Sequence, residues 1–112
     1  MDLWSEIEST LAKLDLALDL TKKRGEEWAQ AKADYYTAKA EAALQMRKDG
    51  VPVTLIEIAV KGDKAVNRAM LEMDIAEVGY DNAREARNVY KKKLDTLREQ
   101  YDREWSRAGM TY

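Results

Sequence analysis

Apolar side chains recur every three or four residues along most of the chain, which is the spacing of amphipathic helices. The first pattern comprises Leu3, Ile7, Leu11, Leu14, Leu18, Trp28, Ala31, Tyr35, Ala38, Ala42 and Met46. The second comprises Val66, Ala69, Met73, Ala76, Tyr80, Ala83, Tyr90, Leu94, Leu97, Tyr101 and Ala108. Alternating steps of three and four define the apolar seam of a coiled coil. We therefore predict two long helices, over about residues 2–48 and 63–108.

The strongest interruption lies between these two patterns. Gly50 followed by Pro52 is typical of a helix end. Thr54, with Glu57 three residues later, has the spacing of a capping box at the start of a new helix. A short helix is therefore expected in a connector over about residues 50–62, with Asp63 capping the helix that follows. Gly25 interrupts the first pattern more weakly, and both a continuous helix and a break there remain open.

A connector of this length lets the second long helix fold back along the first, which predicts an all-α fold. We expect residues 1–112 to form one domain, a long antiparallel helical hairpin of coiled-coil type. With the turn centred near Ile56, the expected facing pairs are Ile7 with Trp105, Leu11 with Tyr101, Leu14 with Leu97 or Arg98, and Leu18 with Leu94. Residues 1–20 carry five acids and one base, and residues 84–107 carry eight bases and five acids. Charge complementarity favours the same pairing.

A second apolar stripe lies beside the seam of the latter helix, formed by Leu71, Ile75, Val78 and Val89. One stripe suffices for one neighbour, so two stripes indicate two neighbours. Together with Leu16 and Leu20, this favours self-association into a four-helix or larger bundle. Alternatively, the connector helix covers part of the stripe within a monomer. The connector's own apolar side chains are expected to cap the bundle or to dock another protein; they include Val51, Val53, Leu55 and Ile58.

The composition excludes several kinds of chemistry. The chain contains no histidine and no cysteine, which rules out disulfides, Cys/His zinc sites, cysteine nucleophiles and the Ser-His-Asp triad. The pair Glu99 and Asp102 fits only half of the carboxylate pattern of the all-α nucleotide pyrophosphatases. We therefore expect a non-enzymatic protein with no catalytic residues, no cofactor and no metal.

The charge balance bears on partners and location. A net charge of −2 and a pI near 5.3 do not favour general binding to nucleic acid or to an anionic membrane. The acidic N-terminal segment is unlike a signal peptide, and no apolar run approaches the roughly 20 residues that span a bilayer. We expect a cytoplasmic protein without a membrane partner.

One local stretch could still contact nucleic acid. Basic side chains are interleaved there with Tyr90 and Tyr101, an arrangement that can hold a phosphate backbone and stack bases; the candidates are Arg84, Lys91, Lys92, Lys93 and Arg98. Both tyrosines lie on the predicted seam, however, and acids dilute the local charge. Complementarity to the acidic N-terminal segment is therefore the favoured interpretation.

Several motifs resemble a group of small helical proteins encoded by phages and prophages of Gram-positive bacteria. They are Asp49-Gly50-Val51-Pro52-Val53-Thr54, Lys61-Gly62-Asp63, Asp74-Ile75-Ala76-Glu77-Val78-Gly79-Tyr80 and Arg103-Glu104-Trp105. The resemblance implies an accessory protein, often encoded near recombination and replication genes. The preferred hypothesis is an oligomer in the bacterial host cell that binds a host or phage protein. The alternatives are an accessory of DNA recombination or replication, and an inhibitor of host defence that holds a protein or small signalling molecule between subunits.

Overall fold

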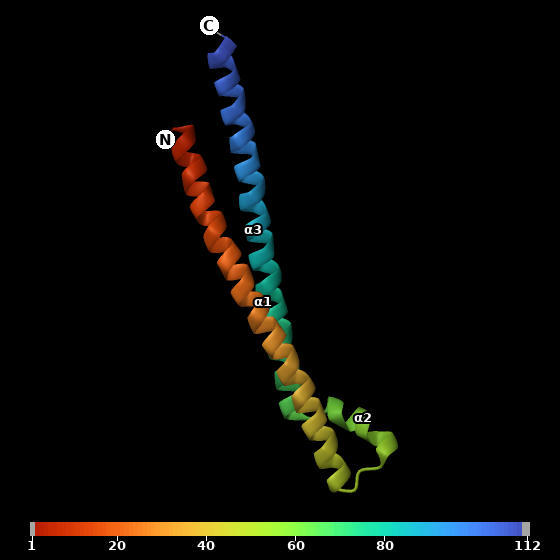
Figure 1. The fold of residues 1–112 in the computed structure, drawn as a ribbon. Coiled ribbons are helices and arrows are strands. Elements are labelled where there is room, and N and C mark those ends of the chain that lie inside the picture. Colours follow the sequence, from red (N-terminus) through yellow and green to blue (C-terminus); the bar gives the residue numbers. More distant parts are fainter. Residues whose placement is uncertain (1, 111–112) are drawn as a thin grey trace. The chain divides into compact units, whose positions relative to one another are not determined.

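The structure is a computed structural model that describes residues 2–110, and that part of the chain contains three α-helices and no strand. Helix α1 spans Leu3–Lys48, α2 spans Val53–Lys61 and α3 spans Lys64–Met110 (Figure 1). The predicted all-α fold and the three helices are confirmed. Gly25 does not break α1, which is continuous.

The chain forms two compact units, and both long helices contribute to each of them. Within the described residues the first unit contains 2–22 and 81–110, and the second contains 23–80, including α2. In each unit α1 and α3 run antiparallel to one another (Figure 1). The antiparallel pairing expected from the sequence is therefore present in both units.

The connector begins with a well-formed helix end. The amide of Val51 donates to the carbonyl of Met46, and the amide of Gly50 donates to the carbonyl of Arg47. This is the Schellman pattern, which requires a left-handed residue after the helix. Gly50 supplies it with φ of 84°. The predicted end of the first helix is confirmed.

The start of α2 differs from the prediction. The helix begins at Val53 with Pro52 in the capping position, and no side chain caps it. Thr54 and Glu57 therefore lie inside the helix and form no capping box there. The proline ring fixes φ near the helical value and starts the helix earlier than a threonine cap would. The cap expected at Asp63 is confirmed, because its Oδ1 accepts a hydrogen bond of 3.0 Å from the amide of Val66.

The α1 side of the seam in the first unit agrees with the prediction only in part: Ile7 is buried, and Leu3 and Leu14 pack against its cluster. Leu11 and Leu18 are exposed, and the buried α1 side chains are Ile7, Thr10, Ala17 and Thr21. Counting back from Trp28 in alternating steps of four and three residues leads to these positions. The heptad frame of the whole helix thus overrides the local leucine pattern, because a continuous helix presents one seam to its neighbour. On α3, the predicted seam positions Ala83, Leu94 and Leu97 are buried as expected.

The facing pairs are also shifted from the predicted register. Ile7 packs with Leu94 and Leu97 instead of lying beside Trp105, which is 71% exposed. The rings of Trp4 and Tyr101 lie 5.9 Å apart. The Thr21 hydroxyl lies 3.2 Å from the carbonyl of Ala83. Compared with the predicted pairs, the register is displaced by about two helical turns.

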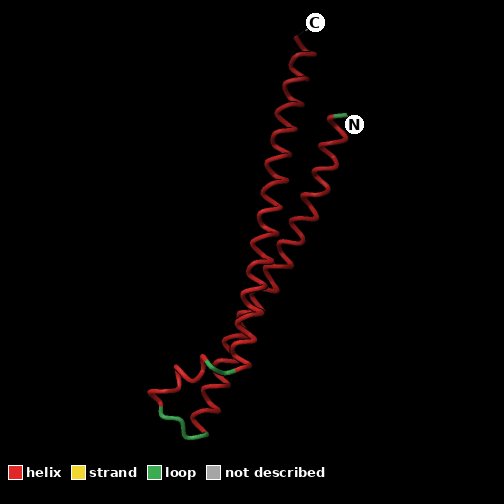
Figure 2. Tube along the Cα trace, turned by 180° about the vertical axis from the view of Figure 1, so that it is seen from behind, coloured by secondary structure: helices red, strands yellow, loops and turns green. Residues whose placement is uncertain are grey.

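The second unit shows the reason for this displacement. Ile56 and Val60 of α2 and Val66 of α3 form a buried cluster, against which α1 packs side chains of its last turns. These partly buried residues are Ala38, Ala42, Ala43 and Met46. Figure 2 shows α2 between its two connecting loops at this end of the second unit. Because α2 covers the end of α1, α3 starts its pairing farther back along α1, and the turn is not symmetric.

Gly25 has a packing role in the second unit. A Cβ at this position would lie 3.3 Å from the Tyr80 ring. The same ring stacks on Trp28 with centroids 5.4 Å apart. The Nζ of Lys32 lies 4.2 Å from the Trp28 centroid, within the range of a cation–π contact. The glycine thus gives the tyrosine ring room against α1.

Candidate functional site

The second stripe of α3 is open to solvent. In the second unit Leu71, Ile75 and Val78 are each more than half exposed, although they share one helix face. In the first unit Val89 is equally exposed. The alternative that α2 covers the stripe is wrong, because α2 packs on the cluster of Ile56, Val60 and Val66. The stripe is therefore available to a partner.

The connector exposes most of the apolar side chains that were expected to dock a partner. Val53, Leu55 and Ile58 of α2 are each more than half exposed, and Ile58 is 68% exposed. Val51 differs, since it is half-buried and packs against the cluster inside the second unit. It belongs to the internal packing of this end of the chain.

The first unit carries a shallow apolar groove of about 260 Å³ that spans both long helices. Leu16, Ala17 and Leu20 line it from α1, and Ala86 and Tyr90 line it from α3. Leu16 is 70% exposed. This groove is the kind of surface that a further helix covers in a four-helix bundle.

The basic stretch on α3 does not form one compact patch. Lys91, Lys92 and Lys93 are all exposed, but consecutive helical residues point in directions about 100° apart. Arg84, Lys91 and Arg98 recur every seven residues and share a face. Arg84 lies 3.3 Å from Asp81 of its own helix. The other ion pairs, Arg24 with Glu27 and Arg68 with Glu72, also lie within one helix and do not explain the register.

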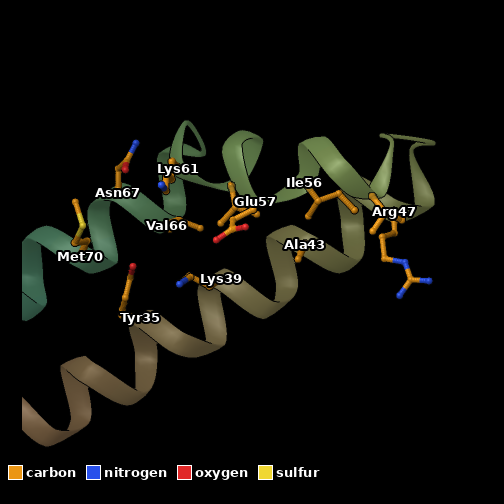
Figure 3. Close-up of a pocket in the computed structure, with 12 residues that line it drawn as sticks. Tyr35, Lys39, Ala43, Arg47, Ile56, Glu57, Lys61, Val66, Asn67 and Met70 are labelled. Atoms are coloured by element: carbon orange, nitrogen blue, oxygen red, sulfur yellow. The ribbon is translucent and has the colours of Figure 1, made fainter.

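A cleft of about 480 Å³ lies in the second unit, and the apolar pattern of the sequence did not indicate it (Figure 3). All three helices line it. Its apolar surface comes from both sides of the connector: Ala43 from α1, Val53, Ile56 and Val60 from α2, and Val66 and Met70 from α3. Pockets of 300 to 1,000 Å³ with mostly apolar walls are typical of small-molecule sites.

Four charged side chains line the same cleft. Lys39 and Arg47 come from α1, and Glu57 and Lys61 come from α2. Figure 3 shows Glu57 pointing from α2 toward α1, with Lys39 below it. None of these four forms an ion pair within the described residues. The Nζ of Lys39 lies 5.3 Å from the centroid of the Tyr35 ring, which also lines the cleft.

The α1 wall of the cleft has a simple spacing in the sequence. Tyr35, Lys39, Ala43 and Arg47 follow one another at four-residue intervals, so they share one helix face. This spacing could have shown that two cations and an aromatic ring border the seam. The opposite wall could not be inferred, because the way α2 folds onto α1 decides which of its side chains face the cleft.

The described residues contain neither a cluster of metal ligands nor a helix suited to span a membrane. Within residues 2–110, no three acidic side chains gather closely enough to hold a metal ion. None of the helices there combines the length and apolar character needed to cross a bilayer. Comparison of the chain with protein families, with curated proteins and with solved structures finds no match.

Proposed function

We propose that the protein acts without catalysis, by associating with copies of itself and binding a partner protein. The observation that carries this proposal is the apolar groove of the first unit, with Leu16 and Leu20 on its α1 side. A pair of helices has no further layer to cover such a groove, whereas a bundle of four does. The exposed stripe at Leu71, Ile75 and Val78 supports the same conclusion in the second unit.

The biological setting is part of the proposal. The resemblance of several motifs to those of phage and prophage proteins supports an accessory role in the cytoplasm of a bacterial host. An accessory role in DNA recombination or replication has weaker support, because the three consecutive lysines point in different directions around α3. The partner is therefore proposed to be a host or phage protein.

Light scattering coupled to gel filtration tests the self-association. The native chain is expected to have at least twice the monomer mass of 12.8 kDa. Leu16→Glu with Leu20→Glu would place two carboxylates in the groove and should yield the monomer. Leu44→Glu is the matched control, since Leu44 is also an exposed α1 leucine but lies outside the groove. A native monomer would refute the proposal, as would an oligomer unaffected by the double variant.

A further inference from the structure

The cleft of the second unit combines two properties that a small ligand would have to match. Its walls are mostly apolar, and its charged side chains are three cations and one acid. Lys39, Arg47 and Lys61 have no ion-pair partner within the described residues. An occupant that suits both properties has an apolar body and a negative head group.

The dimensions favour a small molecule over a helix. The four α1 positions from Tyr35 to Arg47 extend over about 18 Å at 1.5 Å per residue. A helix of that length, with a diameter of about 10 Å, occupies about 1,400 Å³, whereas the cleft holds about 480 Å³. The volume of the cleft lies within the range of about 300 to 1,000 Å³ that is typical of small-molecule sites.

We propose that this cleft binds a single-chain aliphatic anion of about a dozen carbons. The chain would lie against the apolar wall formed by Ala43, Ile56 and Met70. The head group would be held at the end of the cleft where Lys39 and Lys61 lie, while Arg47 lies at the other end (Figure 3). This site lies within one chain and is independent of the self-association proposed above.

Glu57 gives the proposal a specific electrostatic signature. It is the one carboxylate among the residues that line the cleft, and it would repel an anionic head group. Removing its charge should therefore tighten the binding of the anion, whereas removing the charge of the cations should weaken it. If the cleft bound apolar molecules regardless of their charge, neither change would alter its affinity for the anion.

The test uses 12-carbon ligands that differ in their head groups, titrated below their aggregation concentrations. Calorimetry gives the affinity, and the ¹³C-methyl signal of Met70 reports occupancy of the cleft. Dodecanoate or dodecyl phosphate is expected to bind and to shift the Met70 signal, and the tighter of the two identifies the head group. Dodecanol should bind at least about tenfold more weakly, and dodecyltrimethylammonium should not bind.

Two triple variants distinguish the effect of the charges that line the cleft from the effect of the overall charge of the protein. Lys39→Gln with Arg47→Gln and Lys61→Gln should weaken binding by about tenfold or more. Lys23→Gln with Lys48→Gln and Lys64→Gln removes the same charge from residues outside the cleft and should change the affinity by less than about twofold. Glu57→Gln should tighten binding. Circular dichroism checks that each variant remains helical.

Three results would overturn the proposal. The first is equal binding of dodecanol and the anions, and the second is equal weakening by the two triple variants. The third is a Met70 shift caused only by raising the protein concentration, which would assign the cleft to a second copy of the chain.

Discussion

The two units bury their apolar side chains in different ways. The first unit consists of two helices only, and its seam includes Thr10, Ala17 and Thr21 while leucines remain exposed on the same helix. The second unit gains α2 as a third helix, which closes a cluster of Ile56, Val60 and Val66. A helix pair has one line of contact, whereas three helices surround a common interior. The difference shows why the connector places large aliphatic residues at its buried positions, whereas α1 of the first unit can place Thr10, Ala17 and Thr21 on the seam beside its Ile7 cluster.

The largest effect should come from removing a side chain that only the three-helix unit can bury. Ile56→Ala is expected to lower the free energy of unfolding by about 2 to 3 kcal/mol, because it leaves a void in the cluster. Ile58→Ala is the matched control, since Ile58 is on the same helix but exposed, and should cost less than about 0.5 kcal/mol. Urea unfolding measures both. Similar losses for the two variants would show that α2 does not form a third wall.

The next effect concerns the polar seam of the two-helix unit. The Thr21 hydroxyl oxygen lies 2.7 Å from the carbonyl oxygen of Ala17 and 3.2 Å from that of Ala83, and it can donate its one proton to either. Thr21→Val keeps the branched shape and removes the hydrogen bond, which should cost about 1 kcal/mol by urea unfolding. Thr96→Val removes a comparable but exposed bond to Lys92 and should have almost no effect. A Thr21→Val variant as stable as the native chain would show that the seam tolerates an apolar residue there.

Two glycines of the second unit allow a close contact between the helices to be compared with a looser one. A Cβ at Gly79 would make an ordinary contact of 3.8 Å with Arg24, so Gly79→Ala should stabilise by about 0.5 to 1 kcal/mol through helix propensity. Gly25→Ala should raise the free energy of unfolding by less, because the new Cβ would press on the Tyr80 ring, which is already stacked on Trp28. Thermal unfolding measures both variants. An equal rise in Tm would mean that the Tyr80 ring moves aside freely.

The smallest effect lies at the start of α1. The Ser5 amide donates a hydrogen bond of 2.7 Å to Asp2 Oδ1, and this bond lowers the pKa of Asp2 below its ordinary value. A lowered pKa in the folded state gives a stabilisation that is present above the ordinary pKa and is lost as the pH falls through the lowered one. We expect the protection of the Ser5 amide, measured by NMR as its exchange rate relative to the intrinsic rate at the same pH, to decrease below about pH 4. The Asp2→Ala variant should show the lower protection at every pH, and a pH-dependent protection that survives this substitution would exclude Asp2 as its source.

The sequence predicted the helices and the α3 seam because those features depend on local spacing. The positions from Val66 to Leu97 follow one heptad frame, and the second apolar stripe at Leu71, Ile75 and Val78 lies on a separate face of the helix. On α1, leucines at positions 11 and 18 also fit steps of three and four, while the residues actually buried include two threonines. Apolar character alone therefore selected Leu11 and Leu18 wrongly, although Leu3, Ile7 and Leu14 were predicted correctly.

The register and the cleft depend on how the connector folds, which local spacing does not contain. Placing the turn at its midpoint assumed that α2 belongs equally to both long helices. In the structure α2 packs on the end of α1, which moves the facing pairs and creates a cavity bordered by Lys39, Arg47 and Lys61. The stripe at Leu71, Ile75 and Val78 was correctly identified as an apolar surface without a partner inside the chain. Its spacing places it on a different face of α3 from the seam that packs on α1.

The asymmetric turn also has a consequence for how the chain can change in length. Because α2 packs against the last turns of α1, the connector determines which residue of α1 faces the start of α3. Each later pair of facing residues then follows from this first pair, because both helices keep one heptad frame. Insertions or deletions inside either helix would misalign every later pair unless the other helix changed by a matching number of residues. Length variation among natural relatives is therefore expected at the helix ends farthest from the connector, or as paired changes of whole heptads.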